Sequence, residues 1–307
     1  MTDRSDHAGD RTGSLAPVAV HQIYFQGEQR SSLDPAFLPY DNTENARPEW
    51  CEYWIFRKEY FGNRTEGPGV TGYLSWKFAT KTLISGGRFI QFIREHPGYD
   101  VYFINPFQEV RYAYPNVWIQ GDYNHPGLLS FAGKLFARAG YAIDLETSVF
   151  APCSAALANY WVGNAAFWAK YIGFCEPIFD LLENRLTQLE RAFVAKRADV
   201  SRSANYYPFI MERMFSTLLE VDTSIRAIGY QYSFDELRAK YGPHRAAVLE
   251  KADAQTREIR DDFGSAVVRC RQFMRDFYGP LGSMLRSTRT GRWVSLRMSR
   301  LRTGGHR

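Results

Sequence analysis

Apolar residues recur along this chain in two periodicities, which predict strands alternating with helices. Three runs rich in β-branched and aromatic residues indicate buried strands, at residues 18–25, 70–78 and 100–104, and residues 158–162 also look extended. Apolar residues at helical spacing indicate helices at residues 50–61, 87–94, 128–139, 165–188, 208–220 and, with more charge, 244–278. Glycine, proline and small polar residues predict loops at 26–45 and 118–125.

Strands that alternate with helices favour an α/β sandwich around a mixed, mostly parallel sheet flanked by helices. The charged helical pattern of the last third differs from this and predicts a separate helical extension. We therefore divide the chain into a disordered lead (1–16), an α/β domain (17–243), a helical extension (244–282) and a basic amphipathic tail (283–307).

Composition changes this picture little. Apolar residues make up 45% and charged residues 23%, as in ordinary globular proteins. No run approaches the roughly 20 apolar residues that a membrane span needs, and the first residues are polar, unlike a signal peptide. The four cysteines are scattered without a Cys-x-x-Cys pair, so the sequence supports neither a zinc knuckle nor a thioredoxin-type site. These features predict a cytoplasmic protein.

Positive charge is concentrated at the C-terminus. Seven arginines follow Asp276 with no acidic residue among them, so this tail carries +7 while the whole chain carries +5. The rest of the chain is therefore nearly neutral, which counts against a nucleic-acid-binding core. Because Trp293 and several aliphatic residues are interleaved with the arginines, the tail is typical of an anchor on an anionic membrane surface. A tail without a partner and a contact to RNA are the alternatives.

Seven segments in this order resemble a group of bacterial polysaccharide glycosyltransferases. They are HQIYF (21–25), RPEWCEYW (47–54), GYLSWKF (72–78), YDVYFINPF (99–107), HPGLL (125–129), NYWVGNAAFWAKYIGFCEPIFDLLEN (159–184) and YPFIMERMFSTLL (207–219). The resemblance covers roughly residues 18–220. It implies a GT-A-like fold, in which a nucleotide-binding α/β half is joined to an acceptor-binding half, and a nucleotide-sugar co-substrate.

One motif of such enzymes is missing. They usually hold the donor diphosphate through a divalent metal on Asp-x-Asp, and this chain contains no Asp-x-Asp. We therefore do not predict a metal, and metal dependence stays open. A fixed cation can stabilise the charge of a diphosphate leaving group as a metal does. Lys77 and Lys81 are the candidates, with Trp76 beside them and Arg57 behind; solvated surface lysines are the alternative.

The resemblance also suggests further donor-binding residues. Asn159 lies in a segment similar to one that such enzymes use beside the donor sugar, where an amide can bond a hydroxyl. Asn105 follows a strand, at the end where α/β proteins form sites. His21 and Gln22 belong to the first strand, which starts the nucleotide-binding half in the resembling enzymes; a core histidine is the alternative for His21.

Three residues are candidates for catalysis. An inverting transferase needs a base to deprotonate the acceptor hydroxyl, and a carboxylate or a histidine serves that purpose. Asp122 and His125 share one predicted loop, and Glu212 stands in an otherwise apolar helix. Each also has a purely structural interpretation.

Together these observations predict a glycosyltransferase that adds a sugar to a growing cell-surface glycan, such as a capsule, O-antigen or exopolysaccharide, at the inner face of the membrane. The alternative is a non-catalytic carbohydrate-binding or scaffold protein that keeps the fold.

Overall fold

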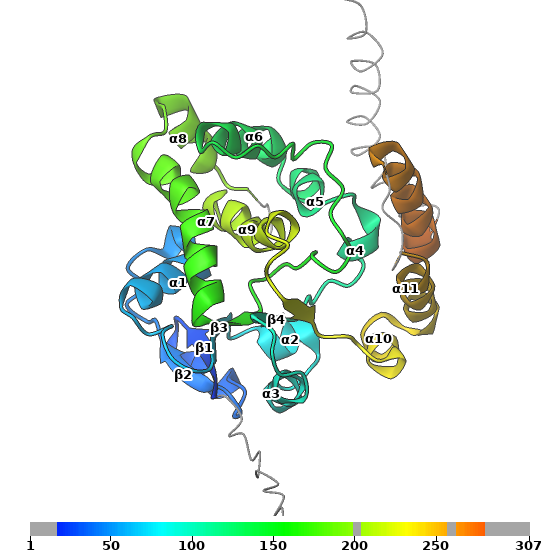
Figure 1. Ribbon diagram of the computed structural model, residues 1–307, viewed down its shortest axis with the longest axis horizontal. Helices are drawn as coiled ribbons and strands as arrows, with labels where there is room; N and C mark the ends of the chain where they lie inside the picture. The colour runs from blue at the N-terminus through cyan, green and yellow to red at the C-terminus, as the bar shows by residue number, and fades with distance from the viewer. Residues whose placement is uncertain (1–16, 199–203, 257–261, 280–307) are drawn as a thin grey trace, which may run out of the picture.

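The computed structural model describes residues 17–198, 204–256 and 262–279 (Figure 1). The described residues form one six-stranded sheet in the order β2-β1-β3-β5-β4-β6. Its strands are β1 (Val18–Tyr24), β2 (Leu38–Asp41), β3 (Val70–Ser75), β4 (Val101–Phe103), β5 (Trp161–Asn164) and β6 (Ala227–Gly229). In this sheet β5 runs antiparallel to β3 and β4, while the other paired strands are parallel. The expected α/β class with a mostly parallel sheet is confirmed.

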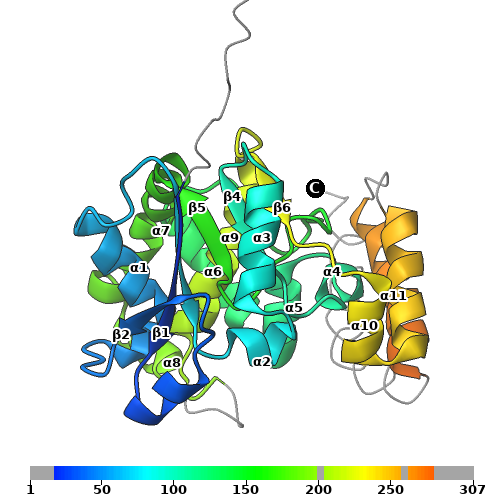
Figure 2. The ribbon, with the colours of Figure 1, turned by 90° about the horizontal axis from the view of Figure 1, so that it is seen from below.

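Two apolar layers cover the two faces of the sheet, because successive residues of a strand point to opposite sides. On β3, Tyr73 belongs to the larger core and Leu74 to the smaller one. On β5, Trp161 and Val162 divide in the same way. Helices therefore pack on both faces, as Figure 2 shows with α3 on one side and α1, α7 and α9 on the other.

The helices follow the strands along the chain. They are α1 (Glu52–Phe61), α2 (Phe78–Thr82), α3 (Gly86–Glu95), α4 (Val110–Ala113), α5 (Val117–Asn124), α6 (Leu128–Arg138), α7 (Ala165–Asn184), α8 (Gln188–Val194), α9 (Tyr207–Val221), α10 (Phe234–Tyr241) and α11 (Pro243–Thr256), with short 3-10 helices at Gly27–Ser32 and Pro48–Trp50 and a last helix over residues 263–279. Among the described residues, no helix is long and apolar enough to cross a membrane.

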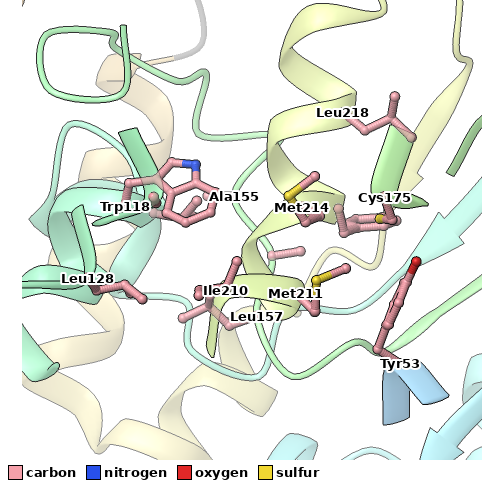
Figure 3. Close-up of a cluster of buried hydrophobic side chains, with 14 of the residues drawn as sticks. Tyr53, Trp118, Leu128, Ala155, Leu157, Cys175, Ile210, Met211, Met214 and Leu218 are labelled. Atoms are coloured by element: carbon pink, nitrogen blue, oxygen red, sulfur yellow. The ribbon is translucent and has the colours of Figure 1, made fainter. Parts of the chain in front are cut away.

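Helix α9 lies at the centre of the larger core, surrounded by α5, α6 and α7 (Figure 1). In Figure 3, Met211 and Met214 of α9 project toward Cys175 of α7 and Tyr53 of α1. All four side chains are almost completely buried. Because α9 is packed from several directions, the positions of the side chains on it are constrained by their neighbours.

The predicted loop at 118–125 is wrong, because these residues form most of helix α5. Asn116 caps this helix by accepting hydrogen bonds from the N–H groups of Trp118 and Ile119. Gly121, which suggested a turn, is instead required by packing: a Cβ there would lie 2.3 Å from Nε of Arg213. Tertiary contact, which the local pattern does not reveal, decides this element.

Two predicted long helices are each divided in two. The helix predicted over 165–188 ends at Asn184, and Thr187 starts α8 with a capping box closed by Glu190. The helix predicted over 244–278 consists of α11 and the helix over 263–279. These two helices stand with α10 beside α4, at one side of the sheet (Figure 1). The predicted tail, residues 283–307, lies outside the described residues.

Candidate functional site

The carboxyl ends of β1, β3, β4 and β6 meet at one edge of the sheet, because these strands run in the same direction. Strand β5 runs the opposite way, so the residues that precede it reach the same edge. The turn into α1 follows β2 and the turn into α2 follows β3, which brings the first residues of both helices there as well. In open α/β sheets this edge is where ligands bind.

Five charged or polar side chains interact at this edge, and we call them the edge cluster: Glu52, Lys77, Lys81, Tyr160 and Glu212. The charges of Lys81, Glu212 and Lys77 all act on the carboxyl of Glu52. Nζ of Lys81 lies 5.6 Å from the centre of the Tyr160 ring, and the hydroxyl of Tyr160 experiences the charges of Glu52 and Glu212. Residues from α1, α2, α9 and the segment before β5 therefore share one site.

Lys81 is held in place through the backbone of its helix. The ammonium of Lys240 donates a hydrogen bond to the carbonyl of Lys81, and the hydroxyl of Tyr232 donates one to the carbonyl of Thr82 at 3.0 Å. These two donors satisfy carbonyls that the short helix α2 leaves without partners at its C-terminal end. Lys77 is exposed, and its ammonium lies 5.0 Å from the centre of the Trp76 ring.

Helix α9 fixes the segment that leads to β5. Glu220 accepts hydrogen bonds from Ala151 N–H and from the Ser154 hydroxyl, at 3.0 and 2.8 Å. One turn earlier, the hydroxyl of Ser216 bonds both the N–H and the carbonyl of Ala156 at 2.9 Å.

One more turn toward the start of α9, Glu212 accepts a hydrogen bond of 2.6 Å from the N–H of Ala158. Residues four apart on a helix lie on one face, so Glu212, Ser216 and Glu220 hold residues 151–158 along the helix.

At the end of the segment that α9 holds, the backbone takes an uncommon conformation. Ala158 and Asn159 have φ angles of 74° and 54°, which non-glycine residues rarely adopt. Asn159 is 8% exposed, and its Oδ1 atom is buried without a hydrogen-bond partner among the described residues. Strained backbone and unsatisfied buried polar atoms are concentrated at functional sites. Asn159 stands between Ala158, which binds Glu212, and Tyr160 of the edge cluster.

Three candidates from the sequence lie together in this cluster. Lys77, Lys81 and Glu212 belong to the edge cluster, with Trp76 and Asn159 next to it. Sequence analysis missed Glu52 and Tyr160, although both lie within segments that carry the resemblance. Glu52 resembles any carboxylate in the first turn of an amphipathic helix, so no local signal distinguishes it.

Three predicted donor-binding residues are engaged elsewhere in structural contacts. Gln22 is completely buried and joins β1 to the carbonyls of Ser75 and Trp76 and to the N–H of Asp34. His21 stacks on Tyr73 with ring centres 4.8 Å apart, and burial lowers its pKa.

Arg57 pairs with Glu176 of α7 at 2.8 Å and lies over the rings of Phe61 and Phe179. It therefore connects α1 to α7.

Asp122 and His125 also make structural contacts. Asp122 accepts hydrogen bonds from Gly127 N–H and Leu129 N–H at the start of α6, and burial raises its pKa. His125 bonds the carbonyl of Ala198 through Nδ1 and stacks on Phe209 at 3.7 Å.

Asn105 is buried and bonds the carbonyl of Ala155 and the N–H of Phe107. It lines a cavity of about 380 Å³ between β4, β6 and the segment over residues 152–155, and Trp76 is not part of that lining. Asn105 and Trp76 therefore do not share this cavity, although both follow strands that end at the same edge.

Within the described ranges, no group of three His, Cys, Asp or Glu side chains could hold a metal ion. No family model, curated protein or solved structure matches this chain.

Proposed function

We propose that this protein is a glycosyltransferase that binds a nucleotide sugar at the edge cluster and transfers the sugar to a growing cell-surface glycan. The observation that carries the proposal is that the charges of Lys77, Lys81 and Glu212 act on Glu52 at the carboxyl edge of a mostly parallel sheet. Beside them lies Asn159, which has a strained backbone and a buried oxygen without a partner among the described residues. The resemblance of seven ordered segments to bacterial polysaccharide glycosyltransferases adds support.

Lys77 and Lys81 are suited to the diphosphate. When the bond between the sugar and the diphosphate breaks, negative charge develops on the leaving phosphate oxygen, and two ammonium groups can stabilise it. The backbone that carries Lys81 is held by Lys240 and Tyr232, and the Lys81 ammonium lies 5.6 Å from the centre of the Tyr160 ring. Preorganised charge of this kind needs no reorganisation during the reaction.

Asn159 is suited to the donor sugar. Its unsatisfied oxygen accepts a hydrogen bond from a hydroxyl or N–H group of the ligand, which removes the penalty of a buried polar atom without a partner. Glu212 is the candidate carboxylate named from the sequence, and its bond to Ala158 suggests that it orients the Asn159 segment.

The test is binding of uridine, guanosine, thymidine and cytidine diphosphates by isothermal titration calorimetry, with and without EDTA. Lys77→Ala is expected to weaken binding roughly ten- to a hundredfold, because a charge-assisted hydrogen bond contributes about 1.5–3 kcal/mol. Lys134→Ala, on the exposed face of α6, is the matched control and should bind like the wild type.

Two outcomes would argue against the proposal. Equal affinity of Lys77→Ala and the wild type would leave Lys77 as a surface lysine, and loss of binding on chelation would replace the lysine pair by a metal. Binding of a nucleoside diphosphate without its release from any nucleotide sugar would favour the non-catalytic alternative.

A further inference from the structure

The carboxyl of Glu52 differs from the other carboxylates around it. Glu212 binds the N–H of Ala158, Glu59 binds the hydroxyl of Tyr40 at 2.6 Å, and Glu176 pairs with Arg57. The carboxyl of Glu52 interacts with its own backbone N–H, but no other described residue forms a hydrogen bond with it or an ion pair within 4 Å, and Glu52 is partly exposed. The fold therefore leaves this carboxylate accessible to a ligand.

The local backbone directs Glu52 to this position. It is the first residue of α1, after Cys51 with φ 49° and ψ −131°, a conformation that non-glycine residues rarely take. The first turn of a helix presents N–H groups without partners and favours negative charge. The strained residue and the helix start together fix a carboxylate at the edge of the sheet.

Charged groups face Glu52 from several elements. Lys77, at the N-cap of α2, Lys81 of α2 and Glu212 of α9 act on the Glu52 carboxyl. Glu52 in turn acts on the neutral hydroxyl of Tyr160 before β5 and on the thiol of the preceding residue, Cys51. Burial by these neighbours raises the pKa of Glu52, and Glu212 raises it further, against the opposing effect of Lys81 and Lys77. A carboxylate whose pKa is raised is a stronger base than an ordinary one.

We propose that Glu52 is the base that deprotonates the acceptor hydroxyl, a role that rests on the proposed transfer function. In this step the acceptor O–H proton passes to a carboxylate oxygen of Glu52. The acceptor oxygen forms a bond to the anomeric carbon of the sugar. The bond from that carbon to the diphosphate breaks, and its electron pair goes to the leaving phosphate oxygen beside Lys77 and Lys81. Atoms and charge balance without a further reactant.

Neighbouring groups are less suited to this role. Glu212 is occupied by the N–H of Ala158 and lies 3.7 Å from the guanidinium of Arg213. Burial raises the pKa of Tyr160, so its hydroxyl keeps its proton. Cys51 has its pKa raised to about 12 by the surrounding protein and also remains protonated.

The test compares Glu52→Gln with the wild type in release of nucleoside diphosphate from UDP-, GDP- and dTDP-hexoses, with water as the acceptor, across pH 5 to 9. We expect the wild-type rate to fall as pH falls through the raised pKa of Glu52, because protonation removes the base. Glu52→Gln should lose roughly 10²- to 10⁴-fold in rate and lose this pH dependence. Its affinity for nucleoside diphosphate should stay within threefold or increase, since a negative charge near the phosphates is gone.

Two further variants make the result unambiguous. Glu66→Gln, at an exposed position before β3 and thus toward the opposite edge of the sheet, should behave like the wild type. Glu52→Asp keeps a carboxylate on a side chain one methylene shorter, so it should retain part of the rate and a pH-dependent profile. It replaces Glu52→Gln if that variant does not fold.

Release that survives Glu52→Gln with an unchanged pH profile would overturn the role of Glu52 and leave the transfer function standing. A wild-type protein that binds no nucleoside diphosphate, or releases none, would instead overturn the transfer function together with this role.

Discussion

Gln22 and Asn159 are both buried amides near the carboxyl edge of the sheet, yet only Gln22 has all its partners within the protein. Gln22 bonds the carbonyls of Ser75 in β3 and of Trp76 just after it, and one N–H of the β1–β2 connection, so its role is to join these segments. Asn159 has an unsatisfied oxygen and a left-handed backbone, which the protein maintains at a cost in stability. This contrast separates a structural amide from a candidate ligand-binding amide.

Replacing Asn159 by Gly tests this assignment. Glycine accommodates a φ of 54° without strain, and no internal hydrogen bond is lost, so the free energy of unfolding should change by less than about 1 kcal/mol. Affinity for the nucleotide sugar that binds should fall roughly tenfold, the equivalent of about one hydrogen bond, while affinity for the free nucleoside diphosphate should not change. Urea denaturation and calorimetry measure these quantities.

Asn63→Gly is the matched control, because Asn63 has a similar φ of 57° but lies at an exposed position after α1. It should leave both affinities unchanged. Equal loss of affinity for the nucleotide sugar and for the free diphosphate in Asn159→Gly would place Asn159 away from the sugar.

At the scale of elements, α9 has two roles, and its sequence pattern alone does not distinguish them. Its apolar side chains fill the larger core, and three polar side chains one turn apart hold the segment that ends at Asn159. Arg213, which is 1% exposed, adds hydrogen bonds to the carbonyl of Val117 and the amide of Gln120 on α5. We therefore expect a change in the polar face of α9 to alter the position of residues 151–158, which lead to the edge cluster.

Ser216→Ala tests whether α9 holds residues 151–158 through the Ser216 hydroxyl. The hydroxyl of Ser216 is completely buried and bonds both backbone groups of Ala156. Its removal leaves these buried groups without partners, so the free energy of unfolding should fall by about 1–3 kcal/mol. Urea denaturation measures this loss. Ser31→Ala, which removes an exposed hydroxyl bonded to the carbonyl of Glu28, should have little effect. Similar stabilities of the two variants would show that α9 does not hold the segment through Ser216.

At the scale of the whole molecule, the proposed glycan acceptor would be linked to a membrane, and the basic tail is our candidate for holding the protein there. Apolar residues and seven arginines are interleaved in residues 283–307. Each arginine near an anionic leaflet contributes about 1 kcal/mol. Added salt should weaken such attraction, because it screens charges.

We expect the full chain to float with vesicles that contain anionic lipid at low salt, and deletion of residues 283–307 to abolish flotation. Release of nucleoside diphosphate from a nucleotide sugar should persist in the truncated protein. Substituting the seven arginines by glutamine, with the apolar residues kept, separates charge from apolar burial and should also weaken binding. A full chain that ignores these vesicles would contradict the membrane proposal.

The sequence by itself determined the class of the fold and the central strands. β1, β3 and β4 are buried between two layers, so their apolar runs are continuous and recognisable. β2 and β6 were not predicted. They are the two outermost strands of the sheet and are short, so they bury little and leave no apolar run. The lysines of the site were predicted from a strand ending in aromatic and basic residues, which is a local signal.

Only the tertiary structure decided which polar residues meet. Glu52 and Glu212 are 160 positions apart in the sequence (212 − 52) and become neighbours because α1 starts, and α9 passes, at the same edge of the sheet. The same packing turned His21, Gln22 and Arg57 into structural partners of Tyr73, β3 and Glu176. Periodicity reports which face of an element is buried, whereas a site depends on how distant elements are placed against one another, and that placement is a property of the packed core.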